Sequence, residues 1–116
     1  MMNMKEIESM SDKKANAVAT QIVYGLDNWV ISDDNRYVVY ELDGTEFPVY
    51  DYVSNPFEVM KEFKISVNLD DGESFAYSGV WYDDISGSIS RYDHESHREN
   101  IGRAIINVFI SMNQKS

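Results

Sequence analysis

The chain of 116 residues has no cysteine, only two prolines and no long apolar run. The missing cysteines exclude a disulfide framework, thiolate catalysis and cysteine-ligated metal sites, and they fit a reducing cytoplasm. A membrane-spanning helix needs about 18 consecutive apolar residues, and residues 1–8 lack the apolar stretch of a signal peptide. We therefore expect a cytoplasmic protein without a membrane partner. It should form a single domain over residues 1–116, with residues 1–10 as a loose N-terminal tail.

Negative charge is abundant and concentrated in the middle of the chain. Twenty acidic and ten basic residues give a formal net charge of −10. Residues 27–95 hold sixteen acids and four bases, whereas residues 1–26 are neutral and residues 96–116 carry +2. Such a field repels phosphate backbones and attracts cations or a basic groove. We expect no direct nucleic-acid binding and one rigid negative face over residues 27–95. The plainer interpretation is that the acids only keep a small domain soluble.

Helical spacing of apolar residues predicts two long helices. The first runs from Ser11, a good N-terminal cap, to Gly25, a typical C-terminal stop. The second is expected to begin near residues 95–97 and to end after Met112, with a wide apolar face. That face consists of Ile101, Ala104, Ile105, Val108, Phe109 and Met112.

A short middle helix is expected to open at Asn55-Pro56, with Asn55 as its cap and Pro56 in the first position. Phe57, Met60 and Phe63 would anchor this helix.

The stretches between these helices indicate strands. Residues 36–42 and 45–50 flank the hairpin turn signal Asp43-Gly44. Residues 64–69 alternate with Ile65, Val67 and Leu69 inward, residues 73–77 pair back, and residues 79–91 hold one further strand. The predicted fold is therefore α+β. It is a small, mostly antiparallel sheet of about four to five strands, packed by an N-terminal helix, a short middle helix and a C-terminal amphipathic helix.

Candidate metal ligands are few. On a helix, His94 and His97 would share a face and could hold Zn²⁺ or Ni²⁺, although a polar loop is the alternative interpretation. The acidic stretches at residues 33–35 and 70–73 lack the ligand spacing of a calcium loop, and we interpret them as turns. We therefore predict no metal and no cofactor.

The sequence contains no recognised catalytic motif, and we predict that the protein is not an enzyme and has no catalytic residues. The pair Asp83-Asp84 could serve a glycosidase only if burial separated the two pKa values. Aromatic residues among acids suit a protein interface instead. The core is the alternative location for them, and the favoured one for Trp29 and Trp81. The interface candidates are Tyr50, Tyr52, Asp70, Asp71, Trp81, Tyr82, Asp83 and Asp84.

Three stretches together resemble the NinX-like family of phage proteins. Residues 50–60, followed by Lys64-Ile65-Ser66-Val67, are similar to the family's aromatic–x–(Asn/Ser)–Asn-Pro–x–(Asp/Glu) block and the strand after it. Residues 100–112 resemble its closing N-P-x-R-A helix, and residues 8–12 its opening helix start. The resemblance covers the whole chain and is weakest over residues 68–95. The family commonly has Cys at Val53, Trp-Pro at Met60-Lys61 and Pro at Ile101, so no shared pocket built on that Trp is expected.

The resemblance implies a small accessory protein of tailed phages and prophages, located in the bacterial host cytoplasm, with no catalytic residues to carry over. The expected function is non-enzymatic binding of a host or phage protein, with host-defence antagonism as one role. Three alternatives stay open. The protein could be a DNA-charge mimic that blocks a nucleic-acid-binding protein, or an enzyme with an unrecognised acidic site. It could also be a homo-oligomer that uses the apolar face of residues 95–112 as a seam.

Overall fold

The computed structural model describes residues 2–70 and 73–114, which form four helices and six strands. The strands make two antiparallel three-stranded sheets, β1–β2–β3 and β4–β5–β6, so the predicted α+β class is confirmed. In chain order the elements are α1 (Met4–Ser9), α2 (Asp12–Tyr24), β1 (Trp29–Ile31), β2 (Tyr37–Tyr40), β3 (Glu46–Pro48), α3 (Phe57–Glu62), β4 (Ser66–Asp70), β5 (Glu73–Tyr82), β6 (Ile89–His97) and α4 (Ile101–Met112).

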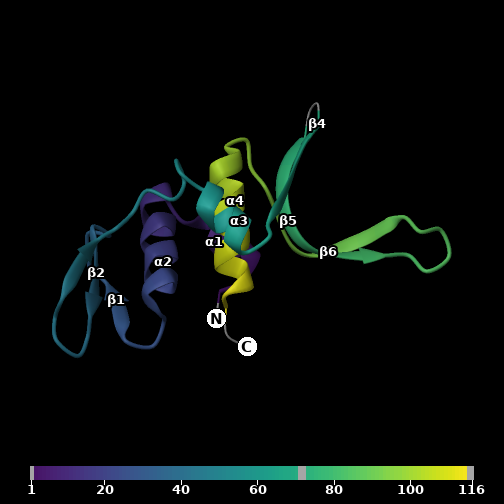
Figure 1. Cartoon of the computed structure of the whole chain (residues 1–116). Coiled ribbons are helices and arrows are strands. Elements are labelled where there is room, and N and C mark those ends of the chain that lie inside the picture. Colours follow the sequence, from purple (N-terminus) through teal and green to yellow (C-terminus); the bar gives the residue numbers. More distant parts are fainter. Residues whose placement is uncertain (1, 71–72, 115–116) are drawn as a thin grey trace.

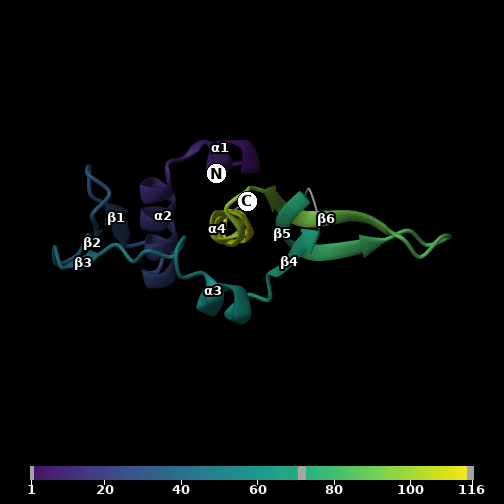
Figure 2. The same ribbon diagram turned by 90° about the horizontal axis from the view of Figure 1, so that it is seen from above.

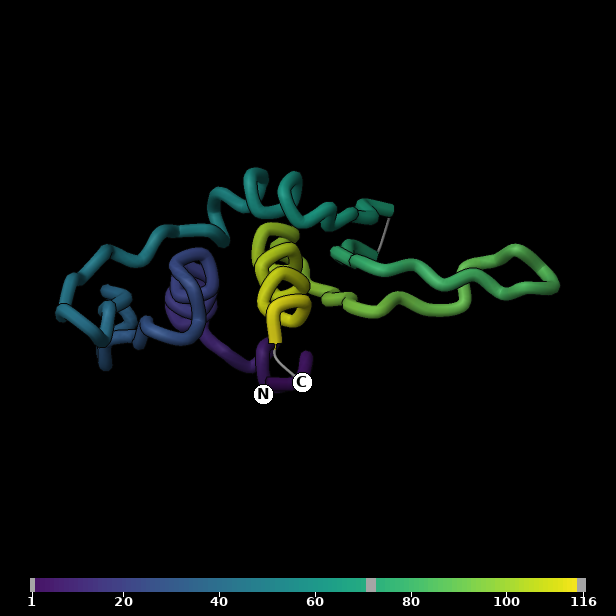
Figure 3. Tube along the Cα trace, turned by 60° about the horizontal axis from the view of Figure 1, so that its bottom comes forward, coloured from purple at the N-terminus to yellow at the C-terminus, as the bar shows by residue number. Residues whose placement is uncertain are grey.

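The two sheets lie at opposite ends of an elongated molecule of 55 × 29 × 24 Å, with the helices between them (Figure 1). The expectation of one sheet of four to five strands is wrong. Strand β3 ends at Pro48, and one further ladder bond follows, from the Val49 amide to the Arg36 carbonyl at 2.8 Å. Residues 49–56 then cross to α3, on the other side of α2, and β4 starts the second sheet beyond it (Figure 3).

Helix α4 is the centre of the fold, surrounded by α1, α2, α3 and the sheet of β5 and β6 (Figure 2). Residues 102–110 are all buried, because the wide apolar stripe meets a neighbour on every side. A dimer seam along this helix is therefore not available. The helix begins at Ile101, not near residues 95–97, because residues 89–97 pair with β5 instead. Asn100 caps it, and its side chain accepts a hydrogen bond from the Arg103 amide.

The N-terminal helices show how local capping sets helix boundaries. The Ser11 hydroxyl accepts a hydrogen bond from the Lys14 amide at 3.1 Å, and Gly25 ends α2 with a φ of 106°, which confirms both predicted ends. Helix α1 has a capping box of Asn3 and Glu6. The side chain of Ile7 on this helix is fully buried in the core. Residues 4–9 are therefore an ordered helix and not a loose tail.

The middle helix is shorter than expected and packs differently. Pro56 occupies the cap position, while the Asn55 side chain donates to the Asp51 carbonyl at 3.2 Å and does not cap the helix. Phe57 is 70% exposed and does not anchor α3; the buried residue of this helix is Val59. Leu69, expected to point inward from β4, is also exposed because that end of the strand extends past the core.

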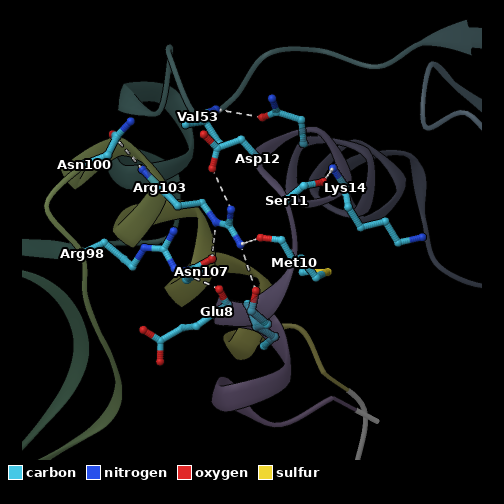
Figure 4. Close-up of polar contacts among 12 residues, drawn as sticks. Glu8, Met10, Ser11, Asp12, Lys14, Val53, Arg98, Asn100, Arg103 and Asn107 are labelled. Atoms are coloured by element: carbon cyan, nitrogen blue, oxygen red, sulfur yellow. Dashed lines mark hydrogen bonds and ion pairs between the residues drawn. The ribbon is translucent and has the colours of Figure 1, made fainter.

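A buried arginine ties the N-terminal segment to α4 (Figure 4). Arg103 is 1% exposed, and its Nε donates to Asn107 Oδ1 at 2.8 Å. One terminal nitrogen donates to Asp12 Oδ1 at 2.7 Å, and the other to the carbonyls of Ile7 and Met10 at 2.9 and 2.7 Å. A buried guanidinium is stable only when its donors are satisfied, so this network fixes α1 and the start of α2 onto α4.

Candidate interaction surfaces

The residues expected at an interface lie in three separate places of the described chain. Tyr50 and Tyr52 belong to residues 49–56, which link β3 to α3. Asp70 is exposed at the end of β4, and Asp71 lies outside the described residues. The remaining four occupy the end of the β5–β6 hairpin: Trp81, Tyr82, Asp83 and Asp84.

The end of the β5–β6 hairpin projects beyond the rest of the molecule (Figure 1). Strand β4 pairs with β5 only over residues 73–77, so residues 78–93 continue as a ribbon of two strands. We call these sixteen residues the distal hairpin. Two-stranded ribbons are marginally stable in water without further support. Contacts among the hairpin's own side chains provide part of that support.

Trp81 makes two specific side-chain contacts within the distal hairpin. The guanidinium of Arg91, its cross-strand partner, lies over the indole ring at 4.7 Å from the centroid. The indole Nε1 donates to Asp93 Oδ1 at 2.7 Å. Gly79 makes room for Asp93, because a Cβ at Gly79 would overlap that side chain. Trp81 is nevertheless half exposed, so the expectation that it belongs to the core is wrong.

Trp29 is not in the core either. It is only partly buried, in a cluster of aromatic rings over β1–β2–β3. The indole lies 4.8 Å from the ring of Tyr24 and 4.9 Å from that of Tyr40, centroid to centroid. In the same sheet, Val38 of β2 is fully buried.

The turn of the distal hairpin presents apolar side chains to solvent. Asp83 Oδ1 accepts hydrogen bonds from the amides of Ser86 at 2.8 Å and Ile85 at 2.9 Å, and these bonds lower the pKa of Asp83. These hydrogen bonds fix a turn in which Ile85 is 97% exposed. Tyr82 and Ile89 beside the turn are also exposed. Our sequence interpretation missed Ile85 and Ile89. The signal was present, because Asp-Asp before and Ser-Gly-Ser after Ile85 form a turn composition.

The negative charge does not form one face. Residues 27–51, at the β1–β2–β3 end, hold seven acids and one base. Residues 70–95, at the β4–β5–β6 end, also hold seven acids and one base. Residues 58–64 between them are neutral. Because the two sheets lie at opposite ends, the −12 of the central region divides into two clusters of −6, and the single negative face expected from sequence is wrong.

The segment of Tyr50 and Tyr52 is held by two side chains of α2. Asn16 accepts a hydrogen bond from the Val53 amide at 2.9 Å and donates to Asp51 Oδ1 at 3.0 Å. The Thr20 hydroxyl accepts from the Tyr50 amide at 3.1 Å. A pocket of about 220 Å³ opens beside this segment, lined by Tyr50, Tyr52, Asn55, Phe57 and Glu58.

The two histidines lie apart and do not share a helical face, because both belong to β6. His94 Nδ1 is 2.7 Å from Ser111 Oγ, whereas His97 stacks on Phe75 and its Nδ1 lies 3.1 Å from Glu73 Oε1. Within residues 2–70 and 73–114, no group of three or more His, Asp or Glu side chains is arranged to hold a metal ion. The acidic stretch at residues 33–35 is a turn, as expected: Asp34 accepts from the Arg36 amide at 3.1 Å.

Comparison with protein-family models, with curated proteins and with solved structures finds no match for this chain. None of the helices in the described part of the chain combines the length and the apolar character needed to cross a membrane.

Proposed function

We propose that the chain is a non-enzymatic accessory protein of a phage or prophage, as its NinX-like resemblance implies. It acts in the bacterial host cytoplasm by binding a host or phage protein through the distal hairpin. The observation that carries this proposal is the exposure of Trp81, Tyr82, Ile85 and Ile89 on one projecting ribbon.

Exposed apolar side chains are ordinary when scattered, but a contiguous group marks an interaction surface. Trp, Tyr and Arg are the residue types that carry most binding energy in protein interfaces, and the distal hairpin has all three. Its shape suits insertion into a cleft of the partner. The hairpin holds three acids and one base over residues 78–93, so the cleft should be apolar with a basic rim.

The test is affinity capture from bacterial lysate with three baits: the natural chain, Ile85→Ser and Leu42→Ser. Leu42 is the matched control, because it is also exposed, at 74%, but lies at the opposite end of the molecule. A partner retained by the natural chain and by Leu42→Ser but lost by Ile85→Ser supports the proposal. Truncating a central anchor costs about 2 kcal/mol, or about thirtyfold in Kd. Equal retention by all three baits would remove the distal hairpin as the binding surface.

The same capture tests two of the remaining candidate functions. A basic partner should be released as salt is raised, since screening weakens charge attraction. If duplex DNA displaces the partner, the protein is a DNA-charge mimic that blocks a nucleic-acid-binding protein. Capture of the chain by its own tagged copy would indicate a homo-oligomer.

A further inference from the structure

We infer that the pocket beside α3, lined by Tyr50, Tyr52 and Phe57, binds a methylated ammonium head group. The group could be free, as in choline, or carried on a trimethyl-lysine side chain of another protein. None of the residues of this pocket belongs to the distal hairpin. The inference therefore does not depend on the function proposed above.

Three aromatic rings supply the walls of the pocket. The rings of Tyr50 and Tyr52 meet edge to face, with centroids 4.7 Å apart and planes at 64°. Phe57 is 70% exposed, so its ring is available to a ligand. Aromatic faces attract cations through the ring quadrupole, and several such faces around one pocket are the usual way to bind quaternary ammonium groups.

The charge of the lining also selects a cation. Glu58 is the charged residue of the lining, and neither Lys nor Arg belongs to it. Burial raises the pKa of Tyr52, and a smaller contribution comes from its neighbours Tyr24, Tyr50, Glu58 and Glu62. The phenol is therefore neutral at pH 7. The cation–π contact in the described part of the chain joins Arg91 to Trp81 on the distal hairpin. The rings of the pocket therefore hold no cation from the described residues.

The lining favours a methylated over a primary ammonium. A primary ammonium brings three N–H donors that lose water on binding, and aromatic faces do not replace those hydrogen bonds. Asn55 uses its amide nitrogen to donate to the Asp51 carbonyl, so its side-chain oxygen and the Glu58 carboxylate are acceptors beside the rings for only part of the three N–H donors. A trimethylated head carries no N–H donor, so it can enter an aromatic pocket without leaving a donor unpaired. The pocket of about 220 Å³ has room for several heavy atoms, given roughly 30 Å³ for one water molecule.

The wall of the pocket formed by Tyr50 and Tyr52 is held in place before any ligand arrives. Asn16 and Thr20 fix residues 50–53 through the hydrogen bonds described above. Hydrogen bonds from Ser54 and from Asn16 lower the pKa of Asp51, so this link is present at neutral pH. Tyr52 also packs against the core. Preorganised walls lower the cost of ordering on binding.

NMR titration of the tyrosine and phenylalanine ring signals tests the site. The probes are choline and its neutral isostere 3,3-dimethylbutanol. Choline should shift the rings of Tyr50, Tyr52 and Phe57 with a millimolar Kd, and the neutral isostere should bind at least threefold more weakly, since only the charge differs. Equal binding of the two probes, or no shift below 50 mM choline, would overturn the inference.

Variants check the location and the source of the ligand. Tyr50→Leu and Phe57→Leu should each weaken choline binding at least threefold, with unchanged far-UV circular dichroism. Tyr37→Leu, at a similarly exposed tyrosine outside the pocket, should bind as the natural chain does. An equal loss in Tyr37→Leu would refute the location. Tenfold tighter binding of a trimethyl-lysine peptide than of choline assigns the head group to a protein partner, and similar affinity assigns it to a free metabolite.

Discussion

Replacing Arg103 with methionine is the sharpest perturbation of this fold. The methionine keeps much of the side-chain volume but removes four hydrogen bonds: those to Asn107, Asp12 and the carbonyls of Ile7 and Met10. Breaking a buried ion pair typically costs about 3–5 kcal/mol. Asp12 is 58% exposed at its side chain and returns to water, so we expect the lower end of that range. The natural stability of a small domain is only about 5–15 kcal/mol.

Urea unfolding followed by circular dichroism measures this loss. We expect Arg103→Met to lower the free energy of unfolding by about 3 kcal/mol and Arg103→Lys by less, since lysine keeps the charge but reaches fewer acceptors. Asp12→Asn is the control: it keeps an oxygen acceptor for the guanidinium and removes only the carboxylate charge, so it should cost less than Arg103→Met. Amide exchange should quicken first in residues 4–9. A loss below about 1 kcal/mol in Arg103→Met would show that the network does not hold the N-terminal segment.

Two further predictions concern the close contacts of the fold. Gly102→Ala should destabilise the protein by about 1–3 kcal/mol in the same urea assay, because a Cβ there would overlap the Val53 carbonyl oxygen. An unchanged free energy of unfolding would show that α4 and the segment of Val53 can move apart at no cost. In the hairpin turn, hydrogen bonds from the amides of Ser86 and Ile85 lower the pKa of Asp83 below its ordinary 3.8. The ionised carboxylate should therefore stabilise the turn at neutral pH. This stability should be lost as acid protonates the carboxylate below about pH 4. A carboxyl NMR titration with a midpoint above 3.8 for Asp83 would contradict this.

Features set by near neighbours in the chain were predictable. The ends of α2 follow from a serine hydroxyl that meets an amide three residues later and from a glycine with positive φ. The turn at residues 43–44 follows from Asp-Gly in the same way. These interactions depend on a few adjacent residues, so the sequence pattern contains all that is needed.

Features set by distant partners were not predictable. Residues 95–97 carry signals that fit a helix start, yet their pairing with β5 overrides that preference. The partners of Arg103 could not be read from the sequence, because Ile7 and Asp12 lie more than ninety positions away in the chain. The interface candidates were separated for the same reason: both stretches read as aromatic and acidic, but the crossing at residues 49–56 sends them to different parts of the molecule.

The Met2 amide donates to the Gln114 side chain at 3.0 Å, so the two ends of the described chain meet beside α4. Both candidate surfaces lie away from this point. Either end can therefore carry a label or a support for capture experiments without blocking the hairpin or the pocket. A short linker between the ends would also allow the polypeptide to be reopened at an exposed turn, such as residues 42–45, as a circular permutant.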